Sequence, residues 1–158
     1  MQERTNPPSV RTAVTLVELT IVVLILGIMA AVAMPRFADA LSRFRADAAA
    51  TRVKADLQLA RRRAKMQSAD QVVDFDASAN LYTLSGVSDL DRPGQTYQVQ
   101  LNRWPYEATI VSVSLGGDET LVFNGFGLPD TGGQIVVQAG SYQLSVLVDA
   151  ASGNVSIQ

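Results

Sequence analysis

The 21 residues 14–34 hold one charged side chain, and apart from Thr15, Thr20 and Gly27 the others are Val, Leu, Ile, Ala and Met. An α-helix of this length extends about 31 Å at ~1.5 Å per residue, which matches the hydrocarbon core of a bilayer. Apolar side chains fall on every face, so the helix needs an apolar environment all round. The segment therefore predicts a transmembrane helix over residues 14–34.

Glu18 is the charged residue in this apolar run. An ionised side chain at the centre of a bilayer costs ~2.5–3.5 kcal/mol, and less near the edge. No Lys or Arg lies within residues 14–34, so a partner for Glu18 must come from elsewhere. The preceding residues 1–13 carry Arg4 and Arg11 against Glu3. Positive charge beside an apolar span stays inside the cell, so we expect a cytoplasmic leader over residues 1–13.

Residues 35–67 predict an amphipathic helical stem that continues the apolar helix. Pro35 has no N–H and its ring crowds the carbonyl of Ala31, which predicts a helix kink at Pro35. Beyond it, apolar side chains recur at helical spacing, and Ala, Arg, Leu and Lys favour helix. The recurring residues are Phe37, Leu41, Phe44 and Ala48, and then, with a shifted phase, Val53, Leu57, Ala60 and Ala64. We expect the β-domain to pack on the second half of this helix, against Leu57, Leu59, Ala60 and Ala64.

Residues 68–158 change in character to short β-branched and aromatic runs separated by turn residues, which is typical of strands joined by tight turns. We expect eight strands, near residues 71–76, 80–84, 95–101, 108–115, 120–123, 134–138, 141–148 and 153–157. No long helix separates them, so they should pair antiparallel. The expected fold class is α+β, with a long N-terminal helix, transmembrane and then amphipathic, packed on an antiparallel β-sheet domain.

Charge is distributed unevenly along the chain. Residues 35–67 contain nine basic and three acidic side chains, a net charge of +6, whereas residues 68–158 contain two arginines and ten acids, a net charge of −8. A basic segment joined to an acidic one favours pairing, either within a subunit or between subunits.

The stretch from Thr15 to Leu24 resembles the type IV pilin and pseudopilin family, in which a short basic leader precedes a Phe-Thr-Leu-Val/Ile-Glu sequence. The resemblance implies cleavage by a prepilin peptidase between Ala13 and Val14, with N-methylation of Val14. Glu18 then becomes the fifth residue of the mature chain and the assembly residue, facing the Val14 amine of a neighbouring subunit. Ala13 stands where the family favours glycine, and Val14 where it favours phenylalanine.

Three further stretches, 55–64, 121–127 and 142–157, resemble the minor pseudopilins of the GspH/FimT type. In the second stretch, Gly125 replaces the proline of a Phe-x-Pro-x-Gly pattern. The resemblance implies a structural subunit of a type II secretion pseudopilus or a type IV pilus, at or near the filament tip. It implies a single pass through the bacterial inner membrane, with the N-terminus cytoplasmic and the C-terminal domain periplasmic. The implied partners are other pilins or pseudopilins.

A secretory signal peptide is the main alternative interpretation. Ala31-Val32-Ala33 has the small-residue pattern of a signal peptidase site, and the product would be a soluble periplasmic β-domain that begins at Met34. Glu18 and the length of the apolar run argue against this interpretation.

A DNA-binding minor pilin is a third interpretation. Arg61, Arg62, Arg63 and Lys65 form a dense basic cluster that could contact phosphates. The acidic charge of residues 68–158 and the few interleaved aromatic residues disfavour it.

Enzymatic and metal-binding functions have little support. The chain has no histidine and no cysteine, so its serines lack the usual activating base and no thiolate is present. The pairs Asp74/Asp76 and Asp89/Asp91 offer oxygen ligands but lack the glycine and terminal glutamate of a calcium loop. We expect no enzyme, no cofactor, no metal and no small-molecule substrate.

Overall fold

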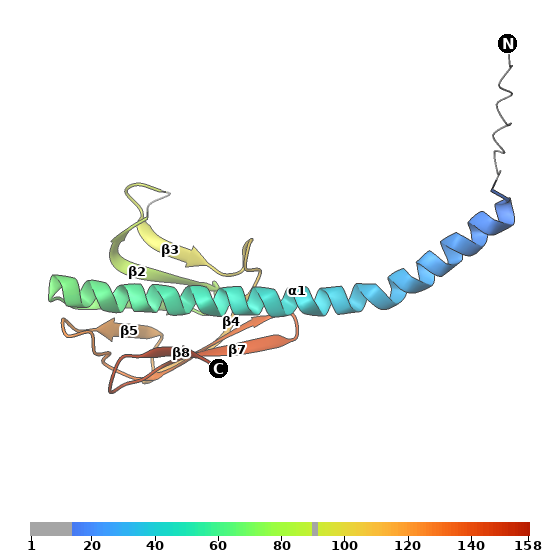
Figure 1. Cartoon of the computed structure of the whole chain (residues 1–158). Coiled ribbons are helices and arrows are strands. Elements are labelled where there is room, and N and C mark those ends of the chain that lie inside the picture. The colour runs from blue at the N-terminus through green and yellow to red at the C-terminus, as the bar shows by residue number, and fades with distance from the viewer. Residues whose placement is uncertain (1–13, 90–91) are drawn as a thin grey trace, which may run out of the picture. The chain divides into compact units, whose positions relative to one another are not determined.

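The computed structural model describes residues 14–89 and 92–158. It contains one helix, α1 (Leu16–Gln67), followed by eight strands (Figure 1). The strands are β1 (Gln71–Asp76), β2 (Leu81–Ser88), β3 (Thr96–Gln100), β4 (Thr109–Leu115), β5 (Thr120–Phe123), β6 (Gly133–Ala139), β7 (Tyr142–Val148) and β8 (Val155–Ile157). The chain divides into two units, Met1–Phe37 and Ala38–Gln158. Every buried side chain among the described residues belongs to the second unit.

The first unit is the N-terminal part of α1. Each described residue up to Phe37 is exposed, including the large apolar side chains of the predicted span. Pro35 lies inside the helix, so the prediction that the helix continues past this proline is confirmed. The kink at Pro35 stays a prediction.

The second unit contains two antiparallel sheets of four strands each, where the sequence predicted one sheet. Their strand orders are β3-β2-β1-β5 and β4-β6-β7-β8. All eight predicted strands are present, and β2 extends to Ser88. The difference arises because β5 pairs with β1, with Val73 opposite Leu121, while β4 pairs with β6. Local turn signals indicate hairpins but carry no information about such pairing between distant strands.

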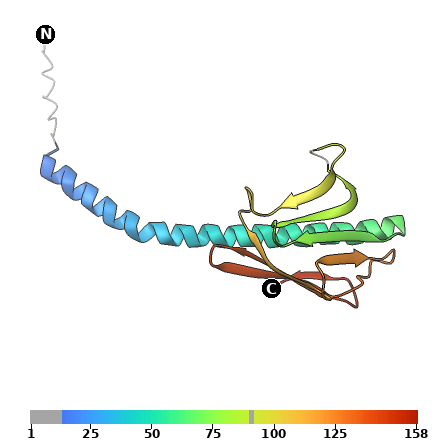
Figure 2. The same cartoon turned by 180° about the vertical axis from the view of Figure 1, so that it is seen from behind.

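The core lies between α1 and the two sheets. In both views β2 and β3 lie on one side of α1, and β5, β7 and β8 lie on the other (Figures 1 and 2). The helix presents mostly alanines, whose small side chains allow the backbones to approach closely. The fully buried helix residues are Ala46, Ala49, Ala50, Val53, Leu57, Ala60 and Ala64. They meet larger sheet residues such as Tyr82 and Phe123, so small and large side chains interdigitate.

The prediction that the β-domain packs on the second half of the helix is confirmed. Val53, Leu57, Ala60 and Ala64 are buried, and Leu59 is half-buried against the core. Phe37 and Phe44 are more than 70% exposed, and Leu41 is also exposed. Buried helix residues begin only at Ala46, so the helical spacing of the earlier apolar residues has no sheet to face. Ala48 is half-buried.

A tight turn after β5 packs against the C-terminal end of α1. The helix ends at Gln67, Ser68 takes a left-handed conformation with φ of 50°, and the Ala69 N–H donates to the Ala64 carbonyl at 3.2 Å. This 6→1 bond is that of a Schellman motif. A Cβ on Gly125 would lie 2.8 Å from the Ser68 carbonyl carbon, so glycine is required where this turn meets the helix end.

Substituting Gly125→Ala should destabilise the second unit by about 1–3 kcal/mol, because the new methyl group overlaps rigid backbone. Urea unfolding of the full chain in mild detergent, followed by circular dichroism, measures the change. Gly27→Ala is the matched control, since a Cβ there meets no atom within 4 Å. Equal unfolding midpoints for the two variants would show that the turn does not press on the helix end.

Candidate functional site

The apolar N-terminal part of α1 is the first candidate site. Its most apolar stretch has a mean hydropathy of 2.7, and none of that stretch is buried. Leu16, Leu24 and Met29 are each about two-thirds exposed or more, although they lie on different sides of the helix. Within the described residues this segment has no protein surface to cover it. Its composition suits insertion into lipid or packing against other apolar helices.

Glu18 occupies the first turn of this helix. Thr15 is the N-cap residue, and its Oγ1 accepts a hydrogen bond of 3.1 Å from the Glu18 N–H. Threonine followed by glutamate three residues later is the capping-box pattern, and an acid in the first turn is favoured by the helix dipole. Glu18 is exposed and forms no ion pair with any described residue. Val14 precedes the helix, and Ala13 lies outside the described residues.

Three residues of the predicted basic cluster, Arg61, Arg62 and Lys65, line one depression, whereas Arg63 binds a different part of the β-domain. Arg61 donates to the carbonyls of Gly127 (3.1 Å) and Ser152 (2.6 Å), whereas Arg63 donates to the carbonyl of Gly86 in β2 (3.3 Å). Arg61 and Arg63 therefore bind different parts of the β-domain. Arg62 and Lys65 are exposed, and together with Gln58 and Arg61 they line a depression of about 210 Å³.

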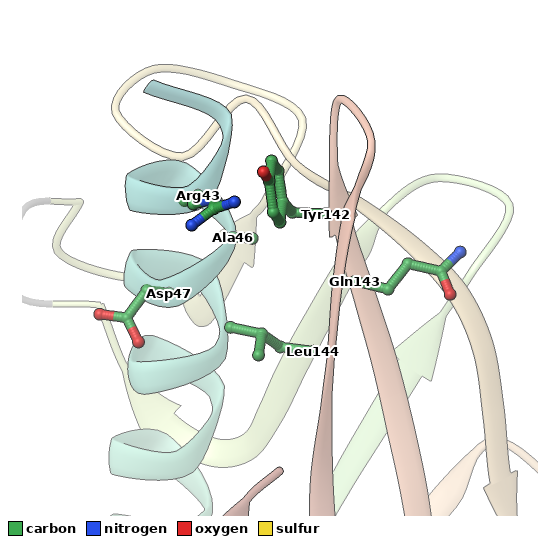
Figure 3. A pocket seen from close by; sticks show the side chains of 6 residues that line it. All are labelled: Arg43, Ala46, Asp47, Tyr142, Gln143 and Leu144. Atoms are coloured by element: carbon green, nitrogen blue, oxygen red, sulfur yellow. The ribbon is translucent and has the colours of Figure 1, made fainter. Parts of the chain in front are cut away.

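A second hollow lies between the start of the buried helix face and β7 (Figure 3). It has a volume of about 300 Å³ and is lined by Arg43, Ala46, Asp47, Tyr142, Gln143 and Leu144. The Arg43 guanidinium lies over the Tyr142 ring, 4.4 Å from its centroid, as in a cation–π contact. This contact attaches the β6–β7 hairpin to α1.

A buried polar cluster around Asp56 was missed by the sequence analysis. Asp56 is only 6% exposed, and its carboxylate accepts hydrogen bonds from Tyr82 Oη (2.6 Å), Tyr97 Oη (3.0 Å) and Arg52 Nε (3.0 Å). Arg52 also donates to the Tyr97 hydroxyl. The available signal was an aspartate at a core position of the helix, between Val53 and Leu57. The cluster ties the helix to β2 and β3 and has the composition of a structural network.

Ionisation of the two tyrosines is suppressed by their surroundings. Burial, followed by the charge of Asp56, raises the pKa of Tyr97 to about 12. The same two causes raise the pKa of Tyr82 well above its ordinary value. Both hydroxyls therefore stay neutral donors to the carboxylate throughout the physiological range.

The acidic pairs considered as calcium ligands are occupied by protein contacts. Asp74 accepts from Ser85 and Thr120, Asp76 accepts from Ser78 and the Ala79 N–H, and Asp89 pairs with Arg92. No cluster of three metal-ligating side chains occurs in the part of the chain that the structure describes. Asp91 lies outside that part.

The sequence model of the family described as Type II transport protein GspH matches residues 49–153, about two-thirds of the chain. The chain belongs to the GspH family. The matched region starts in the buried face of α1 and includes strands β1 to β7, so it ends just before β8. No curated protein sequence matches the chain.

Solved structures with the same fold are themselves pilin-like. The minor pseudopilin EpsH of the Vibrio cholerae type 2 secretion system superposes with a TM-score of 0.54 at 15% identity, over 72% of this chain and 96% of EpsH. The type IV minor pilin FimU of Pseudomonas aeruginosa PAO1 gives 0.51 at 15% identity, over 71% of this chain and 91% of FimU. At this identity the likeness establishes the fold, with one long N-terminal helix packed on antiparallel sheets.

We expect this GspH-family domain to lose stability in alkali, because the Asp56 cluster holds Tyr97 in its neutral form. Unfolded tyrosine ionises near pH ~10, whereas Tyr97 in the folded chain has a pKa of about 12. The stabilisation from Tyr97 is complete below pH ~10 and is lost as pH rises toward ~12, because only the unfolded state releases the proton there. After allowance for solvent screening, the loss should be about 1–2 kcal/mol.

Urea unfolding midpoints across this alkaline range measure the effect, and Tyr97→Phe should flatten their decline with pH. Tyr142→Phe serves as the control, since its hydroxyl makes no hydrogen bond to any described residue. An unchanged slope in Tyr97→Phe would refute a role for this hydroxyl.

Proposed function

We propose that this chain is a structural subunit of a type II secretion pseudopilus or a type IV pilus, assembled through the apolar part of α1. The observation that carries the proposal is an apolar helical segment, exposed on every side and with one acid in its first turn, joined to a GspH-family domain. A helix of this kind needs lipid before assembly and neighbouring helices after it. No enzymatic activity is proposed.

Processing at the boundary between Ala13 and Val14 is part of this proposal. A prepilin peptidase would remove residues 1–13, and Val14 would become the mature N-terminus and the site of N-methylation. Support comes from Val14 itself, which is exposed and lies just before the N-cap residue Thr15. The new terminus would then carry a positively charged amine at neutral pH next to the first helical turn.

The positive charge at Val14 supplies the partner that Glu18 lacks among the described residues. Placing an isolated carboxylate or an isolated ammonium in an apolar environment costs free energy. Placing the two together as an ion pair costs far less. Pairing Glu18 of one subunit with the Val14 amine of its neighbour would select one longitudinal offset between adjacent helices. Glu18 would thus act as the assembly residue, in addition to its favourable position at the helix N-terminus.

Location and partners follow from the same arrangement. Before assembly, residues 14–34 would span the inner membrane, with the leader arginines on the cytoplasmic side and the β-domain in the periplasm. After assembly, the same residues would pack against the helices of other pilins or pseudopilins in a periplasmic filament.

Secretion after cleavage at Ala33 is the alternative with structural support. No described residue before Ala46 is buried, so the domain core does not include the apolar segment. A released domain would leave Glu18 in the discarded peptide. The two proposals therefore differ in whether substitutions at Glu18 affect the mature protein.

Substituting Glu18→Leu should leave membrane insertion intact and reduce incorporation into filaments at least about tenfold, because the offset-selecting charge pair is lost. The measurement is the fraction of this chain in filaments sheared from native cells, compared with the membrane fraction. Thr20→Val is the matched control, since it removes a polar group two residues away without removing a charge. Wild-type incorporation of Glu18→Leu would contradict the pairing role.

A further inference from the structure

An exposed apolar surface forms at the C-terminal end of α1. We call it the distal surface, and its residues are Arg62, Lys65, Met66, Phe126 and Leu128. Met66 is 85% exposed and Phe126 is 83% exposed. The turn that carries Phe126 is held rigidly, because Asn124 Oδ1 accepts from the N–H groups of Phe126 and Leu128, each at 3.0 Å. An aromatic ring fixed outward on an ordered turn is typical of the anchor residue of a protein interface.

The cations of the distal surface are free to pair with another molecule. Arg61 and Arg63 are bound to carbonyls of the β-domain, but Arg62 and Lys65 form no hydrogen bond or ion pair with any described residue. Gly127 lies against the stem of Lys65, since a Cβ on this glycine would lie 2.2 Å from the lysine Cε. Lys65 and the Phe126 turn are therefore neighbours. The distal surface combines an apolar centre with positive charge and fits an acidic protein surface.

The matching acidic surface lies on two adjoining turns of the same fold. We call it the acidic surface, and it consists of Asp76, Asp118 and Glu119. The turns adjoin because the Glu119 carbonyl accepts from the Phe75 N–H at 2.9 Å, and Glu119 Oε2 accepts from the Ala77 N–H at 3.3 Å. None of the three carboxylates forms an ion pair with a described residue.

The acidic surface also exposes backbone at Gly117. Gly117, next to Asp118, has open space where its Cβ would project. Hydrogen bonds from Ser78 and the Ala79 N–H lower the pKa of Asp76, so this carboxylate stays charged.

The two surfaces cannot meet within one chain. Strands β1 and β5 both run between them, six and four residues long, so the surfaces lie roughly 13–20 Å apart at ~3.3 Å per residue. Both strands belong to one sheet, which holds this separation. A contact between the two surfaces therefore joins different copies. Because it pairs unlike surfaces, it is heterologous and leaves one of each free at the ends, as an open-ended array requires.

We propose that the distal surface of one copy docks on the acidic surface of a second copy of this chain. Arg62 and Lys65 face the three carboxylates, and the Phe126 ring covers the backbone at Gly117. This contact rests on the proposed filament function and adds to it a specific interface between β-domains.

The natural chain has no cysteine, so single introduced cysteines report the contact directly. Two differently tagged full-length copies are produced together in native membranes, one carrying Met66→Cys and the other Ser78→Cys. Both substitutions keep Phe126 and the three carboxylates. Ser78→Cys removes a hydrogen bond to Asp76, but an aspartate with the ordinary pKa of ~3.9 is still charged at neutral pH. A short bismaleimide should join the two tags. The control replaces Ser78→Cys with Trp104→Cys, whose native side chain is 83% exposed, and should yield no joined product.

Charge reversal tests the chemistry of the contact. Arg62→Glu combined with Lys65→Glu in the Met66→Cys copy should lower the yield about tenfold, because like charges then face each other. Asp118→Lys combined with Glu119→Lys in the Ser78→Cys copy should restore it. Equal yields with Ser78→Cys and Trp104→Cys, or a yield insensitive to charge reversal, would overturn the proposed contact. A yield that depends on added DNA would overturn it in favour of a nucleic-acid surface.

A third cysteine distinguishes this contact from the filament function itself. Val23→Cys in both copies reports association through the apolar helix. If copies join at Val23 but not between Met66 and Ser78, the filament function stands and the β-domain contact is wrong. If neither pair joins, the contact between copies is wrong, and the filament function is decided separately by the Glu18→Leu experiment.

Discussion

An apolar helical segment that its own domain does not cover is the constraint on which the rest of this molecule depends. Residues 14–34 are exposed throughout, and the core of the second unit is complete without them. An apolar surface of this extent is unfavourable in water and must be removed from solvent. The fold therefore supplies a preformed domain on a helix whose environment must come from lipid or from other chains.

The side chains of α1 differ between its two ends, so the same helix suits two environments. From Ala46 onward its inward face is mostly alanine, which lets two sheets pack closely around it. The charged network of Asp56, Arg52 and Tyr97 adds a directional link to one sheet, where apolar packing alone would allow the helix to rotate or slide. Basic residues such as Arg61 strengthen the attachment of the helix by donating hydrogen bonds to carbonyls of the β-domain. The charge asymmetry along the sequence is thus used partly within the subunit, and Arg62 and Lys65 remain for contacts between subunits.

Much of the fold was predictable from the sequence because its signals are local. Apolar periodicity indicated the helix through Pro35, and turn residues marked all eight strands. The pairing of β1 with β5, and hence the division into two sheets, was not predictable because it joins strands distant in sequence. Phe37, Leu41 and Phe44 recur at helical spacing but lie before the sheets cover the helix, so their periodicity does not lead to burial. The basic run predicts one patch, and Arg61, Arg62 and Lys65 do line one depression, but Arg63 donates to the Gly86 carbonyl instead. Asp56 escaped notice because its partners, Tyr82 and Tyr97, come from distant strands.

The central claim is that the mature chain keeps the apolar segment and its carboxylate and uses them for assembly. The most direct test is to purify the mature protein from whole native cells, soluble and membrane fractions together, and to determine its mass and its N-terminal sequence. The account predicts a chain that starts at Val14, carries a methyl group on its amine and retains Glu18. A chain that starts at Met34 would contradict it, because both the carboxylate and the helix that holds it would have been removed before the protein reached its working form.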